Sequence, residues 1–176
     1  MNQMDLGQRI MIMGASGSGK STMARRLGEL HGLPVVHLDA LYWKPGWIQS
    51  TIEEIGDKIR AAEDQPCWVI DGNYKQTINY RLARADTVIY LDFNRYICLY
   101  RAIRRWMKNY GKTRPDLGEG CPDKLDLPFV KWIFWDYPRK VHGATLVWLA
   151  EIEPPKRVYH LKGNRAVKRF YLALIK

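Results

Sequence analysis

The sequence predicts a single-domain, three-layer α/β protein built on a parallel five-stranded sheet. Five short apolar runs, rich in Val, Ile and aromatic residues, alternate with longer helical segments along its 176 residues. The runs lack polar alternation, which is typical of strands buried on both faces. Strand alternating with helix indicates a parallel sheet with helices on both sides.

The expected strands begin with "RIMIMG" and end with "RVYHL". In order they cover residues 9–14, 34–39, 67–71, 87–92 and 157–161. The helical segments between and after them cover residues 20–31, 51–64, 75–84, 95–109, 129–151 and 164–175. Three strands end in Asp39, Asp71 and Asp92. Ligands of such sheets bind beyond the carboxyl ends of the strands, so we expect at least one of these carboxylates to act in a site rather than as a helix cap.

Composition narrows the class of protein. The formal net charge is +10, which favours anionic partners without separating DNA from ATP. No apolar run has the length of a membrane span, and no signal peptide is apparent at the start, so we expect a cytoplasmic protein without a membrane partner. The three cysteines are odd in number and far apart, which argues against a disulfide framework and a zinc site.

The stretch "GASGSGKST" follows the first strand and opens the first helix. It fits the phosphate-loop pattern G-x-x-x-x-G-K-[ST], in which backbone amides and the helix N-terminus hold phosphate oxygens. The expected nucleotide-binding residues are Gly14, Ala15, Ser16, Gly17, Ser18, Gly19, Lys20, Ser21 and Thr22. Lys20 would reach the β and γ phosphates of ATP, and the Ser21 hydroxyl would hold Mg²⁺. The motif predicts a P-loop NTPase fold.

The chain lacks the N-K-x-D motif with which G-protein switches read their base. It is also too short for a motor or transport ATPase with the usual insertions. A small phosphotransferase that uses ATP and Mg²⁺ is the simplest remaining class.

Several further stretches are more specific than the phosphate loop, namely "HLDALYWKPGW" (37–47), "IDGNY" (70–74), "RLARADTVIYLD" (81–92) and "YGKTRPDLGEGCPDKLDL" (110–127). On these the chain resembles the bacterial DNA topology modulation proteins, small phosphate-loop proteins related to adenylate and shikimate kinases. The resemblance runs from about residue 8 to about residue 174. It implies a strand order of 2-3-1-4-5, and it implies a reaction class without naming the acceptor.

The resemblance also assigns roles to two carboxylates. Asp71 matches the residue that supports Mg²⁺ in adenylate kinases, where a D-G-[FY]-P-R motif begins. Here the motif reads "DGNYKQ", so the Arg that grips a nucleotide acceptor is missing, with Arg81 or Arg84 as possible substitutes. Asp39 matches the position that holds an acceptor hydroxyl in shikimate-kinase-like enzymes, where a carboxylate can take the proton. This favours a hydroxyl acceptor.

Two features flank these positions. The aromatic residues Tyr42, Trp43 and Trp47 either stack on a flat acceptor ring or close the core under a loop. Near the end of the chain, in "HLKGNRAVKRF", Gly163 and Asn164 match the turn that lies against adenine in nucleoside monophosphate kinases, although a plain helix cap explains them equally well.

The segment 95–115 contains seven Lys or Arg and no acid. Helical spacing predicts one apolar stripe (Leu99, Ala102, Ile103, Trp106, Tyr110) and an opposite cationic stripe (Arg101, Arg104, Arg105, Lys108). A loop rich in Gly and Pro follows, and we expect a lid at about residues 108–128. By resemblance, Arg101, Arg105 and Arg114 would close over the transferred phosphoryl group.

The main hypothesis is therefore transfer of the γ-phosphoryl group of Mg-ATP to a small acceptor, a hydroxyl or nucleotide-like compound. The alternative is a nucleotide-dependent DNA-binding protein that modulates DNA topology, although no DNA-reading motif is apparent. Phosphorylation of polynucleotide 5′ ends would combine both features.

Overall fold

The computed structural model describes residues 4–175 and contains a five-stranded parallel sheet. Its strands are β1 (Arg9–Gly14), β2 (Val35–His37), β5 (Trp68–Asp71), β6 (Thr87–Asp92) and β7 (Arg157–Lys162). They lie in the order β2-β5-β1-β6-β7. Counted along the main sheet alone this is the expected order 2-3-1-4-5. The labels differ because β3 (Trp43–Lys44) and β4 (Ile48–Gln49) form a small separate hairpin that the sequence did not predict.

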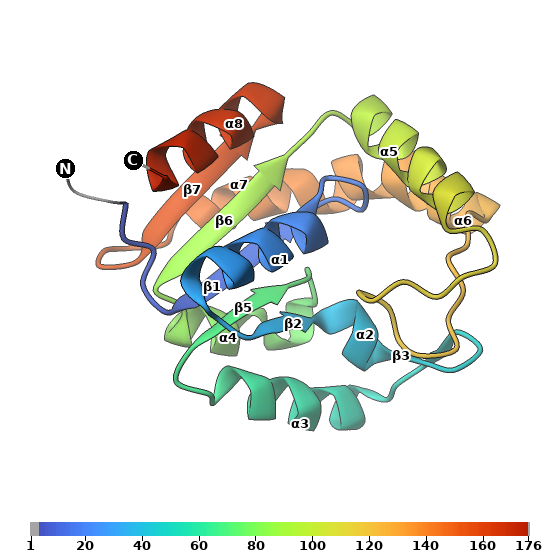
Figure 1. The fold of residues 1–176 in the computed structure, drawn as a ribbon, viewed down its shortest axis with the longest axis horizontal. Helices are drawn as coiled ribbons and strands as arrows, with labels where there is room; N and C mark the ends of the chain where they lie inside the picture. Colours follow the sequence, from blue (N-terminus) through green and yellow to red (C-terminus); the bar gives the residue numbers. More distant parts are fainter. Residues whose placement is uncertain (1–3, 176) are drawn as a thin grey trace.

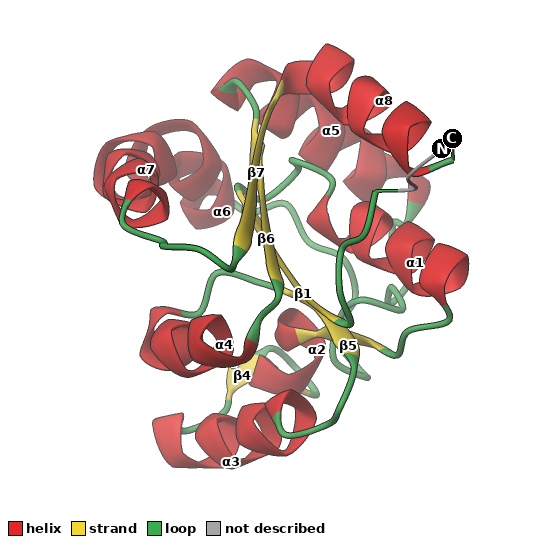
Figure 2. Cartoon of the chain, turned by 90° about the vertical axis from the view of Figure 1, so that its left-hand side faces the viewer, coloured by secondary structure: helices red, strands yellow, loops and turns green. Residues whose placement is uncertain are grey.

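Helices cover both faces of the sheet, as expected (Figure 2). On one side lie α1 (Lys20–His31), α5 (Arg95–Lys108) and α8 (Gly163–Leu174). On the other lie α3 (Ile52–Glu63), α4 (Ile78–Arg84), which follows the short 3-10 turn η1 (Lys75–Thr77), and α7 (Gly143–Ala150). Alternate residues of β1 enter two separate cores, since Ile10 and Ile12 pack with one helical layer and Met11 and Met13 with the other. This alternation explains the unbroken apolar run in the sequence.

Two expected boundaries change. The second strand ends at His37, and Asp39 lies instead in the first turn of the short helix α2 (Leu38–Tyr42). The expected helix 129–151 is a longer helical run of α6 (Leu127–Lys131), two π-helical segments, η2 (Trp132–Asp136) and η3 (Pro138–His142), and α7. Pro138 lacks an amide hydrogen, and the wider π turns accommodate it within the run.

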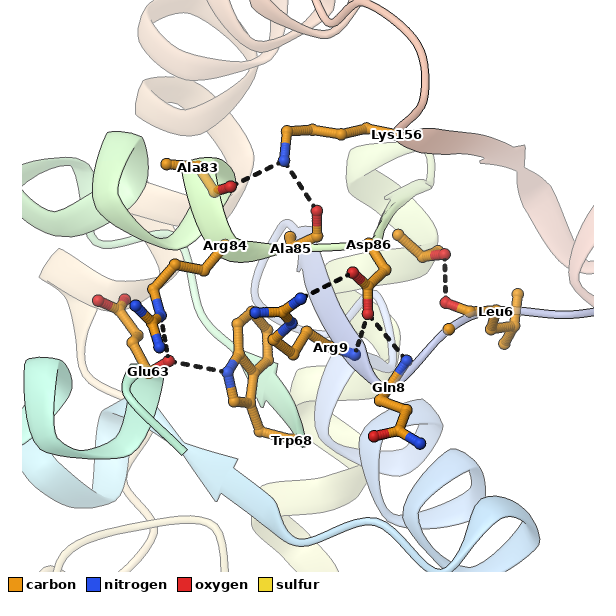
Figure 3. A network of polar contacts seen from close by, with 12 residues as sticks. Leu6, Gln8, Arg9, Glu63, Trp68, Ala83, Arg84, Ala85, Asp86 and Lys156 are labelled. Carbon is orange, nitrogen blue, oxygen red and sulfur yellow. Dashed lines mark hydrogen bonds and ion pairs between the residues drawn. The ribbon is translucent and has the colours of Figure 1, made fainter. Parts of the chain in front are cut away.

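Polar contacts fix the end of the sheet opposite the phosphate loop (Figure 3). Asp86, just before β6, accepts hydrogen bonds from the backbone amides of Gln8 and Arg9, both at 2.9 Å. Lys156 donates to the carbonyl oxygens of Ala83 and Ala85, each at 2.9 Å. These contacts satisfy backbone groups where three parallel strands begin.

A buried ion pair joins α3 to α4. Glu63 and Arg81 are both fully buried and lie 3.3 Å apart, from Oε1 to Nε. Desolvation raises the pKa of Glu63 and lowers that of Arg81, and the mutual attraction only partly offsets it. The Arg81 guanidinium also donates to the carbonyl oxygens of Gly72 and Tyr74, both at 3.0 Å. The pair therefore fixes the turn that follows β5.

Among the described residues, no helix combines the length and the apolar character needed to cross a bilayer.

Replacing Arg81 by Met should lower the free energy of unfolding by about 3–5 kcal/mol, because Glu63 would remain buried without its partner. The double variant Arg81→Met/Glu63→Leu should recover part of this loss, since both charges are then removed. Urea denaturation measures both effects.

Arg60→Met is the matched control, because Arg60 pairs with Asp57 on the exposed side of α3 and should leave the urea midpoint unchanged. If Arg81→Met is as stable as this control, the buried pair does not hold the turn.

Candidate functional site

The phosphate loop bends between β1 and α1 through three glycines. Their φ angles are 147° at Gly14, 83° at Gly17 and 101° at Gly19, a region that strains other residues. A Cβ on Gly17 would lie 2.2 Å from the carbonyl oxygen of Cys98, so the loop packs directly on α5. Gly19 caps α1 without a side-chain hydrogen bond, which leaves the first helical amides available to an anion.

The turn after β5 holds the beginning of this loop. The amide of Gly14 donates to Asn73 Oδ1 at 3.1 Å, and Asn73 Nδ2 donates to the Gly14 carbonyl oxygen at 2.7 Å. A Cβ on Gly72 would lie 2.8 Å from the Leu38 side chain, so the turn also packs tightly against α2. The "DGNY" motif thus joins the phosphate loop to α2.

Oxygen ligands of the kind that Mg²⁺ prefers lie at the first turn of α1. The Ser21 hydroxyl donates to Asp71 Oδ2 at 2.8 Å, and Asp71 Oδ1 contacts His37 Nδ1. Lys20 folds back over the loop and donates from Nζ to the Ala15 carbonyl oxygen at 3.1 Å. Within the described residues no three His, Cys, Asp or Glu side chains form a metal-binding group. A magnesium ion at Ser21 and Asp71 would therefore complete its shell with phosphate oxygens and water.

Arg101 connects two parts of the nucleotide region. Its guanidinium donates to the Ser18 carbonyl oxygen at 3.1 Å and to Asn164 Oδ1 at 2.5 Å. It also lies 4.4 Å from the ring centroid of Phe93. The structure thus brings the phosphate loop, Arg101 and the Gly163–Asn164 turn together, although they are distant in the sequence.

Arg105, which is half-buried, and Arg114, which is buried, meet in a network with two buried carboxylates. Asp123 Oδ2 lies 3.2 Å from Arg105 Nε and 3.6 Å from Arg114 Nε, and Arg114 Nη2 lies 3.3 Å from Asp116 Oδ2. Burial raises the pKa of the Asp116 carboxyl, but Arg114 and the Ser21 hydroxyl outweigh burial and hold it below its ordinary value. Both arginines are therefore already paired within the protein.

The two stripes expected on α5 are only partly right. All four cations line the cleft, namely Arg101, Arg104, Arg105 and Lys108. The face that suggested a DNA surface is thus one wall of the cleft. On the apolar stripe Ala102 is buried, but Ile103 is 37% and Tyr110 72% exposed, because the helix packs on the phosphate loop and η2 through its other side.

Residues 108–128, where the sequence predicts a lid and which are called the lid segment or lid below, lie against the β3–β4 hairpin (Figure 1). A Cβ on Gly118 would lie only 1.9 Å from the carbonyl oxygen of Trp43. The buried Cys121 thiol donates to the Lys44 carbonyl oxygen at 3.1 Å. This close backbone approach means that the lid and the hairpin together cover one end of the cleft.

Asp39 lies in the cleft beneath this cover, beside a cluster of aromatic rings. Tyr74 donates its hydroxyl to Asp39 Oδ1 at 2.7 Å. Burial, and after it the Asp39 carboxylate, raise the pKa of Tyr74 well above its ordinary value, so Tyr74 remains a donor. Tyr42 packs against Tyr74 and edge-on against Trp43, which packs edge-on against Trp47.

The cleft that contains these groups has a volume of about 1450 Å³. Single-ligand pockets are typically about 300–1,000 Å³, so the cleft has room for two substrates. The phosphate loop, α5, the lid and the aromatic cluster all line it. Of the three carboxylates that the sequence placed at strand ends, Asp39 lines the cleft and Asp71 lies behind Ser21. Asp92 does not line it and accepts hydrogen bonds from His142 and His160 at 3.0 and 2.8 Å.

The suggested substitutes for the missing nucleotide-gripping Arg are wrong. Arg81 is fully buried, and Arg84 donates to the Glu63 carbonyl oxygen at 2.7 Å on the far side of the sheet. Neither lines the cleft. Both lie on α4, and Arg81 contacts the turn after β5 from beneath the core rather than from the cleft.

Sequence reasoning missed five residues of the site, namely His37, Asn73, Tyr74, Asp116 and Asp123. Asn73 and Tyr74 carried a signal, since they belong to the "DGNY" motif. The two lid aspartates carried none, because the contact of Asp123 with Arg105 forms only in the folded chain and no motif marks Asp116, the partner of Arg114.

No family model matches the sequence, and no curated protein matches it. Solved structures do show the fold. A shikimate kinase from Acinetobacter baumannii in complex with shikimate matches with a TM-score of 0.56 at 18% identity, covering 96% of this chain and 93% of that one. A gluconokinase from Sinorhizobium meliloti matches at 0.53 and 16%, covering 98% and 92%. A shikimate kinase from Aquifex aeolicus matches at 0.54 and 20%, covering 95% and 96%. The chain therefore has the fold of small P-loop kinases.

Replacing Gly118 by Ala should separate the lid from the hairpin, because the new Cβ cannot fit against Trp43. We expect trypsin to cleave the native protein after Lys112 or Lys124 about tenfold faster. Gly143→Ala is the control, since Gly143 has a helical φ of −60° and a Cβ added there would meet no atom within 4 Å. Equal cleavage rates in the two variants would contradict the docking of the lid.

Proposed function

We propose that this protein transfers the γ-phosphoryl group of Mg-ATP to a hydroxyl group of a small acceptor. The observation that carries the proposal is that the phosphate loop and the Asp39 carboxylate open into one cleft with room for two substrates. The P-loop kinase fold supports it.

The nucleotide would bind along the phosphate loop. Backbone amides and the uncapped start of α1 would hold its phosphates, and Lys20 would turn from the Ala15 carbonyl oxygen toward them. Ser21 and Asp71 would hold Mg²⁺, which neutralises phosphate charge when bound. Arg101 and the Gly163–Asn164 turn lie next to the loop and would face the nucleoside side of ATP.

Asp39 would act on the acceptor. It would accept the proton of the acceptor hydroxyl as that oxygen bonds to the γ-phosphorus and the bond to ADP breaks. The Tyr74 hydroxyl occupies Asp39 Oδ1 and would leave the other carboxylate oxygen to orient the acceptor. Arg105 and Arg114, positioned by Asp116 and Asp123, would stabilise charge on the transferred group with their remaining N–H groups.

ATP with Mg²⁺ should stabilise the protein against heat, by about 2.7 kcal/mol when free ATP is a hundredfold above its dissociation constant. Lys20→Ala should largely abolish this shift, since the loop loses its phosphate-binding ammonium. Lys58→Ala, on the exposed face of α3, should keep it, and adding EDTA to the native protein should reduce it. If no nucleoside triphosphate shifts the melting temperature, the kinase proposal fails.

Asp39→Asn should leave ATP affinity nearly intact but lower turnover by about a hundredfold or more, the usual scale for losing a positioned base. The assay is transfer from labelled ATP to the best acceptor in a screen of hydroxyl compounds. Asp57→Asn, at an exposed site on α3, should match the native enzyme. A variant at Asp39 that loses Mg-ATP binding but keeps acceptor affinity would show that Asp39 and Asp71 have exchanged roles.

A further inference from the structure

We infer that the acceptor is an uncharged ring compound that carries the reacting hydroxyl. The inference rests on the proposed function and names the class of compound that this end of the cleft recognises. Two independent features lead to it, the pairing of charges around Asp39 and the open aromatic faces beside it.

The cations that line the lid end of the cleft are already paired with carboxylates. Arg105 and Arg114 share Asp123, whose side chain is only 2% exposed, and Arg114 also pairs with Asp116. Releasing an arginine to a new anion would weaken the pairing of a buried carboxylate, which is unfavourable.

Lys124 is also engaged at this end. Its ammonium lies 3.2 Å from Asp126 Oδ2 and 4.6 Å from the ring centroid of Trp47. Lys44, on the hairpin itself, lies 2.7 Å from Glu54. Asp39 adds a carboxylate here, so a carboxylate or phosphate on the acceptor would meet a negative charge beside cations that each already have a carboxylate partner.

Two cations of the cleft lie at the phosphate loop, where Lys20 and Arg101 bond to neutral oxygens. Arg104 and Lys108 continue the cationic stripe of α5 from there toward the lid. Beyond them the cleft gathers the carboxylates of Asp39, Asp116 and Asp123. This distribution suits a polyphosphate along the loop and α5 and a neutral compound beside Asp39.

Aromatic side chains form the wall next to Asp39. Tyr42, Trp43, Trp47 and Tyr74 all line the cleft and all are only half-buried, so each keeps an accessible portion. Trp47 is held in place by a hydrogen bond of 3.1 Å from Nε1 to the Pro122 carbonyl oxygen, at an unusual φ of 63°. Strained backbone of this kind persists where the surroundings fix a side chain for use. Such a wall binds the apolar face of a ring and leaves its hydroxyl to Asp39.

The pairing does not prevent the two arginines from acting on the transferred group. A guanidinium has five N–H donors, and the contacts with Asp116 and Asp123 use only part of them. The same carboxylates therefore position the arginines for the phosphoryl group, and they neutralise the positive charge that the arginines would otherwise present to the acceptor.

The test compares matched compounds that differ in charge, with labelled ATP as donor. The pairs are adenosine and AMP, glucose and glucuronate, and methyl shikimate and shikimate, so that nucleosides, sugars and cyclic polyols are separate arms. We expect the neutral member of the accepted pair to have a kcat/KM at least about tenfold higher than its charged partner. Transfer to charged members only, equal use of both, or no transfer to any neutral member would overturn the inference. A preference for the charged member would contradict this inference but not the kinase proposal. Only failure of the native protein to bind ATP would contradict the kinase proposal itself.

A variant links the preference to the paired charges. Asp123→Asn is nearly isosteric and should free the two arginines. We expect it to lower KM for the charged member by about tenfold and so to reduce the ratio of kcat/KM between the neutral and the charged member. Asp136→Asn, whose partner Lys140 lies on an exposed helical surface, should leave the ratio unchanged. An unchanged ratio in Asp123→Asn, or an equal change in both variants, would show that these pairs do not exclude anionic acceptors.

Discussion

The fully buried guanidinium of Arg81 holds the turn on which the candidate site is built. It pairs with Glu63 and donates to two carbonyl oxygens of the turn after β5. That turn brings Asp71 to Ser21 and Asn73 to the phosphate loop. It also brings the Tyr74 hydroxyl to the carboxylate of Asp39. A charge that cannot be left unpaired in the core thus fixes, relative to one another, the residues that we propose for metal, phosphate and acceptor binding.

At the other side of the cleft, backbone packing performs the same role. Gly118 lets the lid approach Trp43 more closely than any other residue would permit, and the aromatic wall and the lid therefore form one surface. Asp123 on the lid forms an ion pair with Arg105 on α5, which joins the lid to the other wall of the cleft. The basic segment 95–115 contains no Asp or Glu, and two of its arginines pair with aspartates of the lid that follows it. These two arginines, Arg105 and Arg114, are neutralised there, whereas Arg101 bonds to neutral oxygens at the phosphate loop.

Much of the fold was predictable because it depends on local patterns. Five apolar runs and the segments between them matched the main sheet and most helices to within about two residues. The boundaries that failed were those where tertiary contacts compete with pattern, such as the π segments around Pro138 and the short helix that carries Asp39. The prediction that Ile103 and Tyr110 belong to a packed apolar stripe was wrong for the same reason. Helical spacing shows which residues share a face but not whether another element covers that face.

The sequence by itself determined the phosphate loop, because its nine residues are consecutive and bind through their own backbone and the helix they begin. It also brought Asp39, Asp71 and the arginines of α5 into consideration through strand ends and helical spacing. Only the tertiary structure decided which of these groups meet. The contacts of Arg105 with Asp123 and of Gly118 with Trp43 join residues from separate elements, and no local pattern encodes the partner of a buried charge or of a closely packed glycine.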